Sequence, residues 1–523
     1  MSETAAKSDA WYPIKAGSDG LVALAMAKTI IDKGLADSDF IENKTDFNLQ
    51  NLKSLLSPYS PQSAERESGV NASVIERLAI DFATQTPSVA IFGGGITDHE
   101  NGIQNARCIS LLNWIVGNLE KKGGLFFPRT PGRQLDNERQ PQPIRLNREN
   151  TIRGIQELEQ INARIDTYFV YISNPAYSEP DCQSAARFLK NEKAVPFLVV
   201  MDTHLTETAM LADIILPAAT YLEGWGLNSA PSLENMPITN LRQPVVSLLS
   251  PARVLRSPAF DIGKLLEPSF QPMGEAVEIG NVCLELARRI GRNVSNKLPF
   301  QDTQEYVSKE IPGYGIQEGL ESLKKNGFSI HRSPKKASSR RGGGNLRTAP
   351  KVKIYSKSLE QKSAPPLPGY QAIPAHKGKK DDEFILTTFK PNLMGRGTAN
   401  SKWIREILHE NRLWINKRAA GQLGIKNGDR IRVISKKGSL NTRALTTNRI
   451  HPESVALAEG LGHTAVGNVA RSRNFKSKDK DTSLIWWSQK GNGVNPMEII
   501  ETKPDPSGGG LGLKDTIVRI EKI

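Results

Sequence analysis

The chain has 523 residues, too many for a single hydrophobic core, which predicts about two to four domains. Its composition, 38% hydrophobic and 24% charged, is typical of an ordinary soluble globular protein. No run of about 18 apolar residues is present, and the first residues have no apolar stretch like that of a signal peptide, so we expect neither a membrane-spanning helix nor an export signal in this sequence.

The net charge of +14 comes mainly from one segment. Residues 331–380 contain 13 Lys or Arg and one Glu, among many Pro, Gly and Ser residues. We interpret this segment as a solvated, flexible linker. A tether to an acidic partner, a lipid surface or RNA is the alternative. Because few aromatic residues stand between its charges, we expect no nucleic-acid partner.

Three cysteines, Cys108, Cys182 and Cys283, lie far apart in the sequence and form no CxxC motif. This spacing excludes a local cysteine-rich zinc or iron–sulfur site within the chain. Each cysteine stands in a helix-like context, so we expect three buried structural thiols.

Up to about residue 330, predicted helices alternate with short apolar strands. Helical spacing of apolar residues predicts helices over 19–35, 71–86, 101–119, 181–191, 204–212 and 274–291. Apolar runs bounded by turn residues predict strands over 88–96, 167–175, 195–203 and 213–218. This alternation predicts an α/β fold with a doubly wound, mainly parallel sheet.

After about residue 381 the composition becomes rich in β-formers. The runs "FILTTF", "RIRVISK", "NTRALTT" and "SVALAEG" predict short strands, and "KNGD" predicts a turn. We expect a β-barrel with small helices in this part.

Two features of the α/β part could bind a ligand. The glycine-rich turn at 93–95 suits an anion, although it lacks the spaced dinucleotide fingerprint and serves equally well as a tight crossover. Asn174 and Asp202 follow predicted parallel strands, where open sheets bind nucleotides, but both are also good turn formers. No GxSxG, HExxH or Walker A motif is present. The residues alone therefore indicate a unit that binds a nucleotide-like ligand, joined to a barrel.

The order of several longer motifs resembles the large catalytic subunits of molybdopterin oxidoreductases, the dimethyl sulfoxide reductase superfamily, in their C-terminal portion. The motifs in the α/β part are "WYPIKAGSDGLVALAMAKTIIDKGL", "GGGITDHENG", "SNP" and "VVMDTHLTETAMLADIILPAATYLEGWG". Those in the β-rich part are "GRGTANSKWIREI", "LWINKRAAGQLGIKNGDRIRV", "HPESVALAEGLGH" and "VNPMEII". Ala16 and Ser18 stand where the family usually has Pro and Thr.

The resemblance implies four regions. These are a piece of a cofactor-binding α/β domain (1–50), a molybdopterin oxidoreductase α/β domain (51–330), the basic linker (331–380) and a double-psi type β-barrel that binds the molybdopterin dinucleotide (381–523). The cofactor would be molybdopterin guanine dinucleotide with molybdenum or tungsten.

The resemblance also assigns cofactor-binding residues. In the α/β part, one pterin dinucleotide would contact Gly17, Ser18 and Asp19, the cofactor cavity would face Gly95, Thr97 and His99, and a guanosine pocket would contain Asn174, Asp202 and Thr208. In the barrel, pterin or phosphate would be held by Arg396, Thr398, Asn400 and Ser401, and the site would be closed by Gly462, His463 and Asn495.

The sequence departs from the family in one respect. Full-length members carry a cysteine cluster for an iron–sulfur centre and a loop that supplies a ligand to molybdenum, and neither is found here. We therefore leave the catalytic residues unassigned, predict no metal ligand in this chain, and expect an iron–sulfur cluster only in a preceding part. Our hypothesis is that Met1 lies inside the family's pattern, as in half of a split gene, a truncated reading frame or a cofactor-poor subunit.

Two functions remain open. In the first, the chain is part of an enzyme for two-electron redox of a small oxyanion or sulfur compound in anaerobic respiration, with a preference for sulfur compounds (polysulfide, thiosulfate or tetrathionate) or arsenic oxyanions. Its partners would be an N-terminal half or companion chain, a ferredoxin-like iron–sulfur subunit and a membrane anchor, as in family members that are often membrane-associated and periplasmic. In the second, the chain is a cofactor-free scaffold in a respiratory complex like alternative complex III.

Overall fold

A computed structural model describes residues 1–128, 154–231, 235–245, 275–314, 316, 319–331, 351–395, 398–471, 491–508 and 510–523. The chain divides into two compact units, each assembled from separate stretches of sequence. Unit 1 comprises Met1–Phe126, Pro175–Arg187 and Gly344–Ile523, and unit 2 comprises Phe127–Asn174 and Phe188–Gly343. These units divide the chain differently from the four regions that the resemblance implies.

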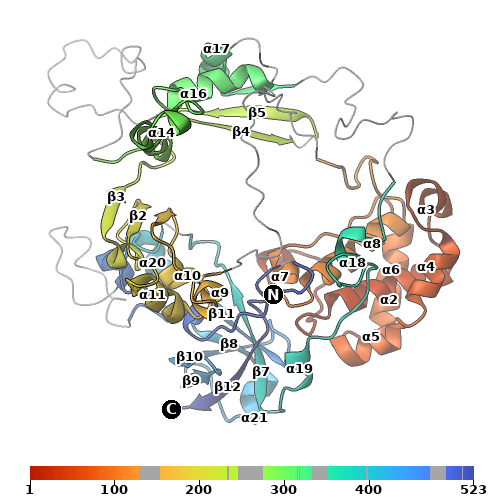
Figure 1. Ribbon diagram of the computed structural model, residues 1–523. Helices are drawn as coiled ribbons and strands as arrows, with labels where there is room; N and C mark the ends of the chain where they lie inside the picture. Colours follow the sequence, from red (N-terminus) through yellow and green to blue (C-terminus); the bar gives the residue numbers. More distant parts are fainter. Residues whose placement is uncertain are drawn as a thin grey trace, which may run out of the picture. The chain divides into compact units, whose positions relative to one another are not determined.

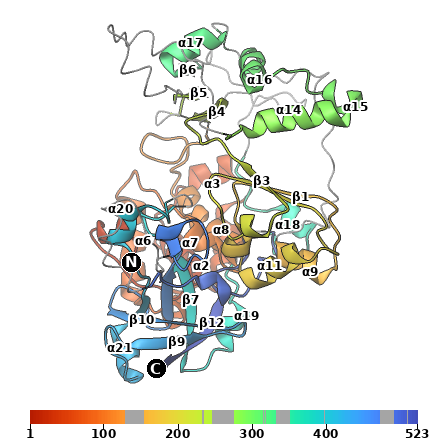
Figure 2. The same ribbon diagram turned by 90° about the vertical axis from the view of Figure 1, so that its left-hand side faces the viewer.

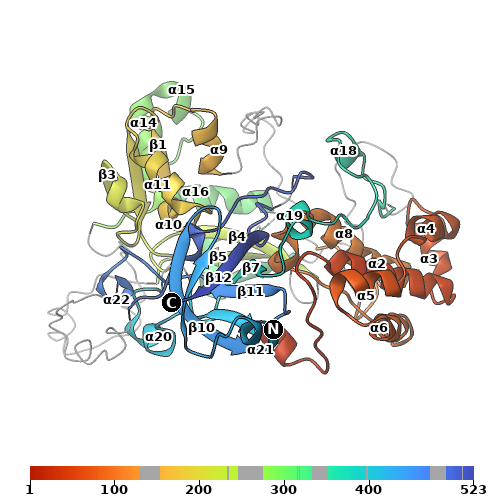
Figure 3. The same ribbon diagram turned by 90° about the horizontal axis from the view of Figure 1, so that it is seen from below.

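The first part of unit 1 is a cluster of helices around α2 (Figures 1 and 3). Its members are α1 (Glu3–Ala6), α2 (Asp19–Asp32), α3 (Ser38–Lys44), α4 (Leu49–Leu56), α5 (Pro61–Ser68), α6 (Ala72–Thr84), α7 (Gly94–Thr97) and α8 (Gly102–Ile115). Helix α2 contacts α4, α5, α6 and α8. It can do so because small and aliphatic side chains such as Leu24, Ala27 and Ile30 are buried along its length. The helices predicted over 19–35, 71–86 and 101–119 are confirmed.

The second part of unit 1 is a closed barrel of six strands in the order β10-β8-β11-β7-β12-β9. Its strands are β7 (Glu383–Phe389), β8 (Leu413–Asn416), β9 (Arg430–Ile434), β10 (Ser439–Thr447), β11 (Ser454–Ala458) and β12 (Thr516–Lys522). Strand pairs β10–β8 and β11–β7 are parallel, and the other neighbours are antiparallel. Short helices α18 (Lys357–Glu360), α19 (Pro374–Lys377), α20 (Lys402–Ile407), α21 (Lys417–Gln422), α22 (Asn468–Arg471) and η5 (Pro496–Glu498) accompany these strands.

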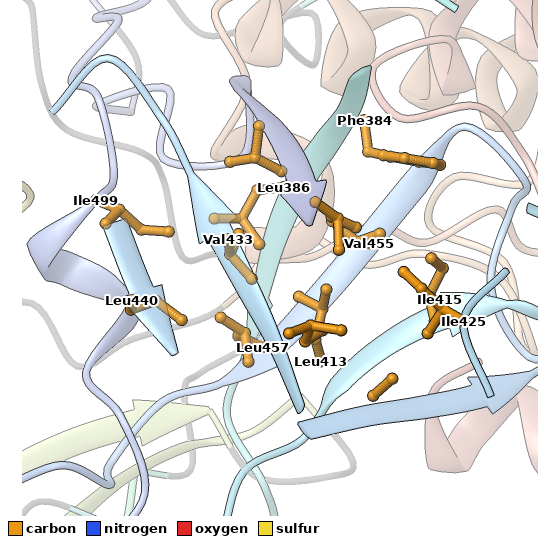
Figure 4. Packing of buried hydrophobic residues seen from close by; sticks show 14 of the residues in the cluster. Phe384, Leu386, Leu413, Ile415, Ile425, Val433, Leu440, Val455, Leu457 and Ile499 are labelled. Atoms are coloured by element: carbon orange, nitrogen blue, oxygen red, sulfur yellow. The ribbon is translucent and has the colours of Figure 1, made fainter. Parts of the chain in front are cut away.

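Alternating side chains fill the barrel. In β9, Ile431 and Val433 are buried while Arg430 and Arg432 are exposed, which is the period-2 pattern of a strand with one face on a core. Leu386, Leu413 and Leu457 from three other strands point into the same interior (Figure 4). The predicted class, an α/β part with a parallel sheet followed by a β-barrel, is confirmed.

Residues 351–380 do not form the solvated, flexible linker that their composition predicted. Ile354 and Ile373 are buried. Arg107 on α8 donates through Nη2 to the carbonyl oxygens of Ile354 and Pro366, each at 2.7 Å. The burial of these apolar side chains and the hydrogen bonds to the backbone thus hold this stretch against the rest of unit 1, although it is rich in lysine. The other part of the predicted linker, residues 332–350, lies outside the described residues.

Unit 2 contains two small sheets (Figure 2). Strands β1 (Tyr168–Tyr171), β2 (Leu198–Asp202) and β3 (Ile214–Pro217) form a parallel sheet, with β2 buried along its whole length. The second sheet is antiparallel and consists of β4 (Gly226–Pro231), β5 (Pro237–Arg242) and β6 (Phe328–Ile330). Its helices are α9 (Ile155–Gln160), α14 (Ile279–Ile290), α15 (Arg292–Ser295), α16 (Thr303–Glu310) and α17 (Gly319–Asn326), with η2 (Ala209–Leu211) and η3 (Ile311–Tyr314) as 3-10 turns.

Two helices fall at the junctions of the two units, α10 (Pro175–Ser178) in unit 1 and α11 (Cys182–Lys190) across the boundary. Along the stretches that the structure describes, no helix has the length and apolar character needed to cross a bilayer.

Three local predictions were wrong. Residues 204–212 form only the short turn η2, because the side-chain oxygens of Asn174 and Thr206 accept the backbone N–H groups of Thr208 and Ala209. Residues 88–92 form no strand, since side chains of α8 rather than a neighbouring strand bond their backbone. Cys283 is exposed, because α14 buries the face that carries Leu284 and Ala287.

The other two cysteines are buried as predicted, and burial raises the pKa of the Cys108 thiol to about 12. Strands β4, β5, β6, β8 and β12 were not predicted from the sequence.

The barrel core gives a direct stability test. We expect Leu386→Ala to lower the free energy of unfolding by about 2–5 kcal/mol, because it opens a cavity at a fully buried position. Leu393→Ala is the matched control, since Leu393 is 43% exposed and its truncation should cost less than about 0.5 kcal/mol. Hydrogen exchange of the barrel amides under native conditions measures both, and equal costs would contradict this packing.

Candidate functional site

A cavity of about 780 Å³ lies at one end of the barrel. It opens where β10 begins and β11 has ended, and the loop before η5 completes it. It is lined by Ser439, Leu440, Asn441, Gly462, His463, Thr464, Asn468, Arg471, Asn492, Gly493, Val494, Asn495 and Glu498. Barrel mouths commonly bind ligands of this size. The cavity brings together three of the predicted residues, Gly462, His463 and Asn495.

His463 of the cavity lining belongs to an aromatic pair. The rings of Tyr177 and His463 stack with centroids 3.8 Å apart and planes 14° apart. The Tyr177 hydroxyl donates to the Leu461 carbonyl oxygen at 2.8 Å, and Asn495 Nδ2 donates to the Tyr177 carbonyl oxygen at 2.8 Å. Tyr177 is therefore fixed by its ring, its hydroxyl and its backbone, which holds the His463 ring in one orientation.

The backbone beside this pair is held close by glycines. Gly462 has φ +78°, and a Cβ there would collide with the backbone nitrogen of Asn495. Gly493 has φ +79°, and a Cβ there would lie 2.6 Å from Asn411 Oδ1. Asn411 in turn accepts from the Val494 N–H at 2.8 Å and donates to the Val494 carbonyl oxygen at 2.7 Å. The two loops that close the cavity thus pack at a spacing that only glycine permits.

The lining is polar and weakly charged. Asn441, Asn492 and Asn495 offer both donors and acceptors, and Arg471 supplies a positive charge. Burial raises the pKa of Glu498, which favours its neutral form. Such a lining suits a ligand with several hydroxyl, amide or phosphate groups rather than an apolar one.

Residues of the "TANS" motif sit beside the cavity but not in its lining. Asn400 Oδ1 accepts from the backbone N–H groups of Val469 and Ala470 at 3.1 and 3.2 Å, which anchors α22. Thr398 closes its own turn by accepting from the Gly395 N–H, and Ser401 stands before α20. The fourth predicted residue of this group, Arg396, lies outside the described residues.

A buried basic side chain that was not predicted from the sequence follows the "TANS" motif. Arg405 on α20 is only 1% exposed, and burial lowers the pKa of its guanidinium to about 10, while the nearby Tyr177 acts in the opposite direction. Sequence reasoning also missed Tyr177, Asn468, Arg471 and Asn492 as members of this site. The asparagines and Tyr177 carry no motif by themselves, because ordinary turn chemistry explains them equally well.

Unit 2 holds the second group of predicted residues at the carboxyl ends of β1 and β2. Asn174 Oδ1 accepts from both the backbone N–H and the hydroxyl of Thr208, at 3.0 and 2.9 Å. Asp202 Oδ1 accepts from the Thr203 N–H at 2.7 Å. Asp202 Oδ2 is buried and has no hydrogen-bond partner among the described residues. A buried carboxylate oxygen without a donor is costly, so this atom fits a ligand that brings N–H groups.

The third group lies in the helical part of unit 1 and is tied into a buried polar network. His99 Nδ1 is 2.6 Å from Asp515 Oδ1, and His376 Nε2 is 3.0 Å from the same oxygen. Asp515 Oδ2 accepts from the Glu100 N–H at 2.7 Å. Burial raises the pKa of Asp19, and the charge of His99 opposes that shift.

The remaining members of this group are mostly structural. Gly17 has φ +78°, and its carbonyl oxygen accepts from Asn101 Nδ2 at 2.9 Å. Ser18 is buried and donates to the Lys15 carbonyl oxygen at 2.7 Å. Thr97 presents its carbonyl oxygen to Gly102 and Gly510, where a Cβ would collide with it, and Gly95 is exposed beside Lys514. None of these residues is among those that line the barrel cavity.

The chain joins an α/β part to a barrel whose polar cavity suits a nucleotide-like ligand. Two family descriptions match it: "Molybdopterin oxidoreductase" over residues 2–253 and "Molydopterin dinucleotide binding domain" over residues 384–516. Together they span most of the chain, which therefore belongs to the molybdopterin oxidoreductase family, within the dimethyl sulfoxide reductase superfamily.

Several curated relatives are similar along most of this chain. The thiosulfate reductase molybdopterin-containing subunit PhsA of Salmonella typhimurium is 25% identical, over 90% of this chain and 64% of its own length. Dimethyl sulfoxide reductase DmsA of Escherichia coli is 23% identical, over 99% of this chain and 66% of its own length. The chain thus spans about two thirds of the length of these relatives.

The fold is also found in a solved structure. Acetylene hydratase from Pelobacter acetylenicus matches with a TM-score of 0.74 and 19% identity, over 100% of this chain and 73% of that chain. At this identity the match shows the shared fold alone.

The polar network around Asp515 predicts a pH dependence. Burial alone would raise the pKa of Asp515, but its contacts with His376 and His99 lower it well below its usual range. A carboxyl whose pKa is depressed on folding stabilises the protein above its unfolded pKa of about 3.9, and this stability is lost as the pH falls through the folded pKa.

We therefore expect Asp515→Asn to lower the free energy of unfolding at pH 7 and to weaken its decline below about pH 4. Chemical unfolding followed between pH 7 and pH 3 measures both effects. Asp181→Asn, at a carboxylate that pairs with Lys437, is a control for changing one salt-bridged aspartate. An unchanged pH profile in Asp515→Asn would contradict this role for the network.

Proposed function

We propose that the chain is the C-terminal portion of a molybdopterin-dependent oxidoreductase subunit and that it binds molybdopterin guanine dinucleotide. The observation that carries this proposal is the polar cavity at the barrel mouth. Glycines let its loops pack closely, and the Tyr177–His463 pair is fixed beside it. Its position in the domain that matches the dinucleotide-binding family supports the proposal. The dinucleotide would carry molybdenum or tungsten, which supplies two-electron redox chemistry when bound.

In this proposal the barrel residues bind and orient the pterin and phosphate groups. Arg471 would pair with a phosphate, and the asparagine side chains of the lining would bond pterin amides or phosphate oxygens. His463, held by Tyr177, would form a rigid wall that excludes water from one side. Thr398, Asn400 and Ser401 would shape the adjoining loop, and Arg396 would add a second positive charge.

The guanosine end is assigned to Asn174, Asp202 and Thr208 in unit 2. Guanine presents N1–H and N2–H₂ donors on one edge, and the unpaired Asp202 Oδ2 is the acceptor such an edge requires. Asn174 and Thr208 bond to each other and would hold the strand ends that frame this oxygen. Gly17, Ser18, Asp19, Gly95, Thr97 and His99 would border the cofactor through their backbone and through the network around Asp515.

The relatives support a proposal for the substrate class. These include a thiosulfate reductase subunit, a dimethyl sulfoxide reductase and the arsenate respiratory reductase subunit of Chrysiogenes arsenatis. We propose a small oxyanion or sulfur compound as substrate, in anaerobic respiration. The metal ligand and an iron–sulfur cluster would come from the part of the family's length that this chain does not match. A ferredoxin-like subunit and a membrane anchor would complete the assembly.

The guanosine assignment predicts a selective loss of nucleotide binding. We expect the purified chain to bind GDP more tightly than ADP and Asp202→Asn to weaken GDP about ten- to a hundredfold, because an amide N–H₂ would then face the guanine donors. ADP binding should not change. Calorimetric titration of both nucleotides measures this.

The matched control is Asp213→Asn, because Asp213 is an aspartate of the same sheet whose carboxylate accepts from the Leu198 N–H. It should keep the preference for GDP. Equal binding of GDP and ADP by the unsubstituted chain, or an unchanged GDP affinity in Asp202→Asn, would contradict the assignment.

A further inference from the structure

Residues 88–92 are bonded along one edge only. The Ala90 N–H donates to Asn113 Oδ1 at 2.8 Å, and Asn113 Nδ2 donates back to the Ala90 carbonyl oxygen at 2.8 Å. The Ser88 carbonyl oxygen accepts from Asn118 Nδ2 at 2.7 Å. Two asparagines at and after the end of α8 therefore satisfy this edge in the way that a neighbouring strand would.

The opposite edge is open. In an extended chain, the N–H and C=O groups of successive residues point to alternate edges. Because Ala90 faces Asn113, the backbone groups of Val89 and Ile91 face the other way. Among the described residues, no hydrogen bond reaches the backbone of Val89, Ile91 or Phe92.

The side chains of this segment are exposed and apolar, as is typical of a strand that pairs with another strand. Ile91 is 76% exposed, Phe92 44% and Val89 37%. The run "SVAIF" combines β-branched and aromatic residues and carries no charge. Natural edge strands are usually protected by a lysine, a proline or a bulge, and no such device stands between Ser88 and Phe92.

We infer that residues 88–92 are the edge of an incomplete sheet, which is completed by a β-strand of another stretch of polypeptide. A polypeptide backbone offers donors and acceptors at the spacing that Val89 and Ile91 present, which is the mode of strand addition. The occupant we assign is the part of the family's length, about one third, that this chain does not match in its relatives. The choice of occupant rests on the proposed function, whereas the open edge rests on the geometry alone.

A photoreactive residue at the edge tests this inference. We would place p-benzoylphenylalanine at position 92 of the full chain in its native host and identify the cross-linked peptide by mass spectrometry. The expected product joins position 92 to a polypeptide that matches the portion of the relatives preceding the region matched here. The same probe at Phe328 is the control, since Phe328 on β6 is 49% exposed, and should not give this product.

A backbone variant then separates strand pairing from simple proximity. Ile91→Pro removes one open N–H, and we expect it to lower the yield of the cross-link by about tenfold, the factor that corresponds to one lost hydrogen bond of about 1.4 kcal/mol. Ile91→Ala keeps the N–H and should retain most of the yield. Neither variant should shift the unfolding midpoint of the purified chain by much, because Ile91 is exposed.

Each other outcome counts against the inference. A cross-link between two copies of this chain would replace the assigned occupant by a self-paired edge, and a cross-link to an unrelated protein would overturn the occupant as well. Absence of any cross-link, or equal yields in Ile91→Pro and Ile91→Ala, would overturn strand pairing itself. The expected cross-link together with a chain that shows no preference for GDP would leave this inference intact and count only against the proposed function.

Discussion

The carboxylate of Asp515 joins three stretches of unit 1 that are far apart in the sequence. It stands at the start of β12 and contacts His99 and Glu100 before α8 and His376 on α19. Because a buried carboxylate is costly without donors, these contacts together stabilise the ionised Asp515. The helices, the basic segment and the last barrel strand are thereby fixed to one another, and Asp505, which accepts from the Ile103 N–H at 2.8 Å, repeats the arrangement nearby.

The barrel cavity is likewise held by a few contacts between segments that are far apart in the sequence. Its loops are held by glycines at positive φ and by the side chain of Asn411. Hydrogen bonds from Asn492 Nδ2 to the His463 carbonyl oxygen and from the Met497 N–H to Asn495 Oδ1 fix two asparagine side chains of the lining. Tyr177 reaches His463 from a segment more than 200 residues earlier in the chain. The same tyrosine orients His463 and receives a hydrogen bond from Asn495, which links two of the predicted cofactor residues through one that no motif indicates.

Local patterns predicted elements in which the apolar residues follow a clear period. Helix α2 and strand β9 follow the periodicity of their apolar residues, because the faces they bury are covered by nearby elements. The same reasoning failed at residues 88–92, where the strand pattern is present but no neighbouring strand lies in the described residues. It failed again at 204–212, where Asn174 and Thr206 compete for the backbone N–H groups.

The candidate site was predicted only in part, for a related reason. Gly462, His463 and Asn495 stand in family motifs and do meet in the cavity, whereas Tyr177 and Arg471 depend on tertiary contacts that spacing cannot reveal. The Nδ1 of His99, a residue predicted to face a cofactor, is bonded to a carboxylate 416 residues later. Such long-range pairs are set by the fold, and composition gives no sign of them.

The most direct test of this account is the metal and pterin content of the chain as purified from its native host with the polypeptides that accompany it. The account predicts molybdenum or tungsten together with an oxidisable pterin and releasable GMP, in an assembly that includes a companion polypeptide carrying the cysteine-rich part of the family. A stable assembly that contains neither metal nor pterin would contradict it and would instead indicate a scaffold that has kept the fold of an oxidoreductase.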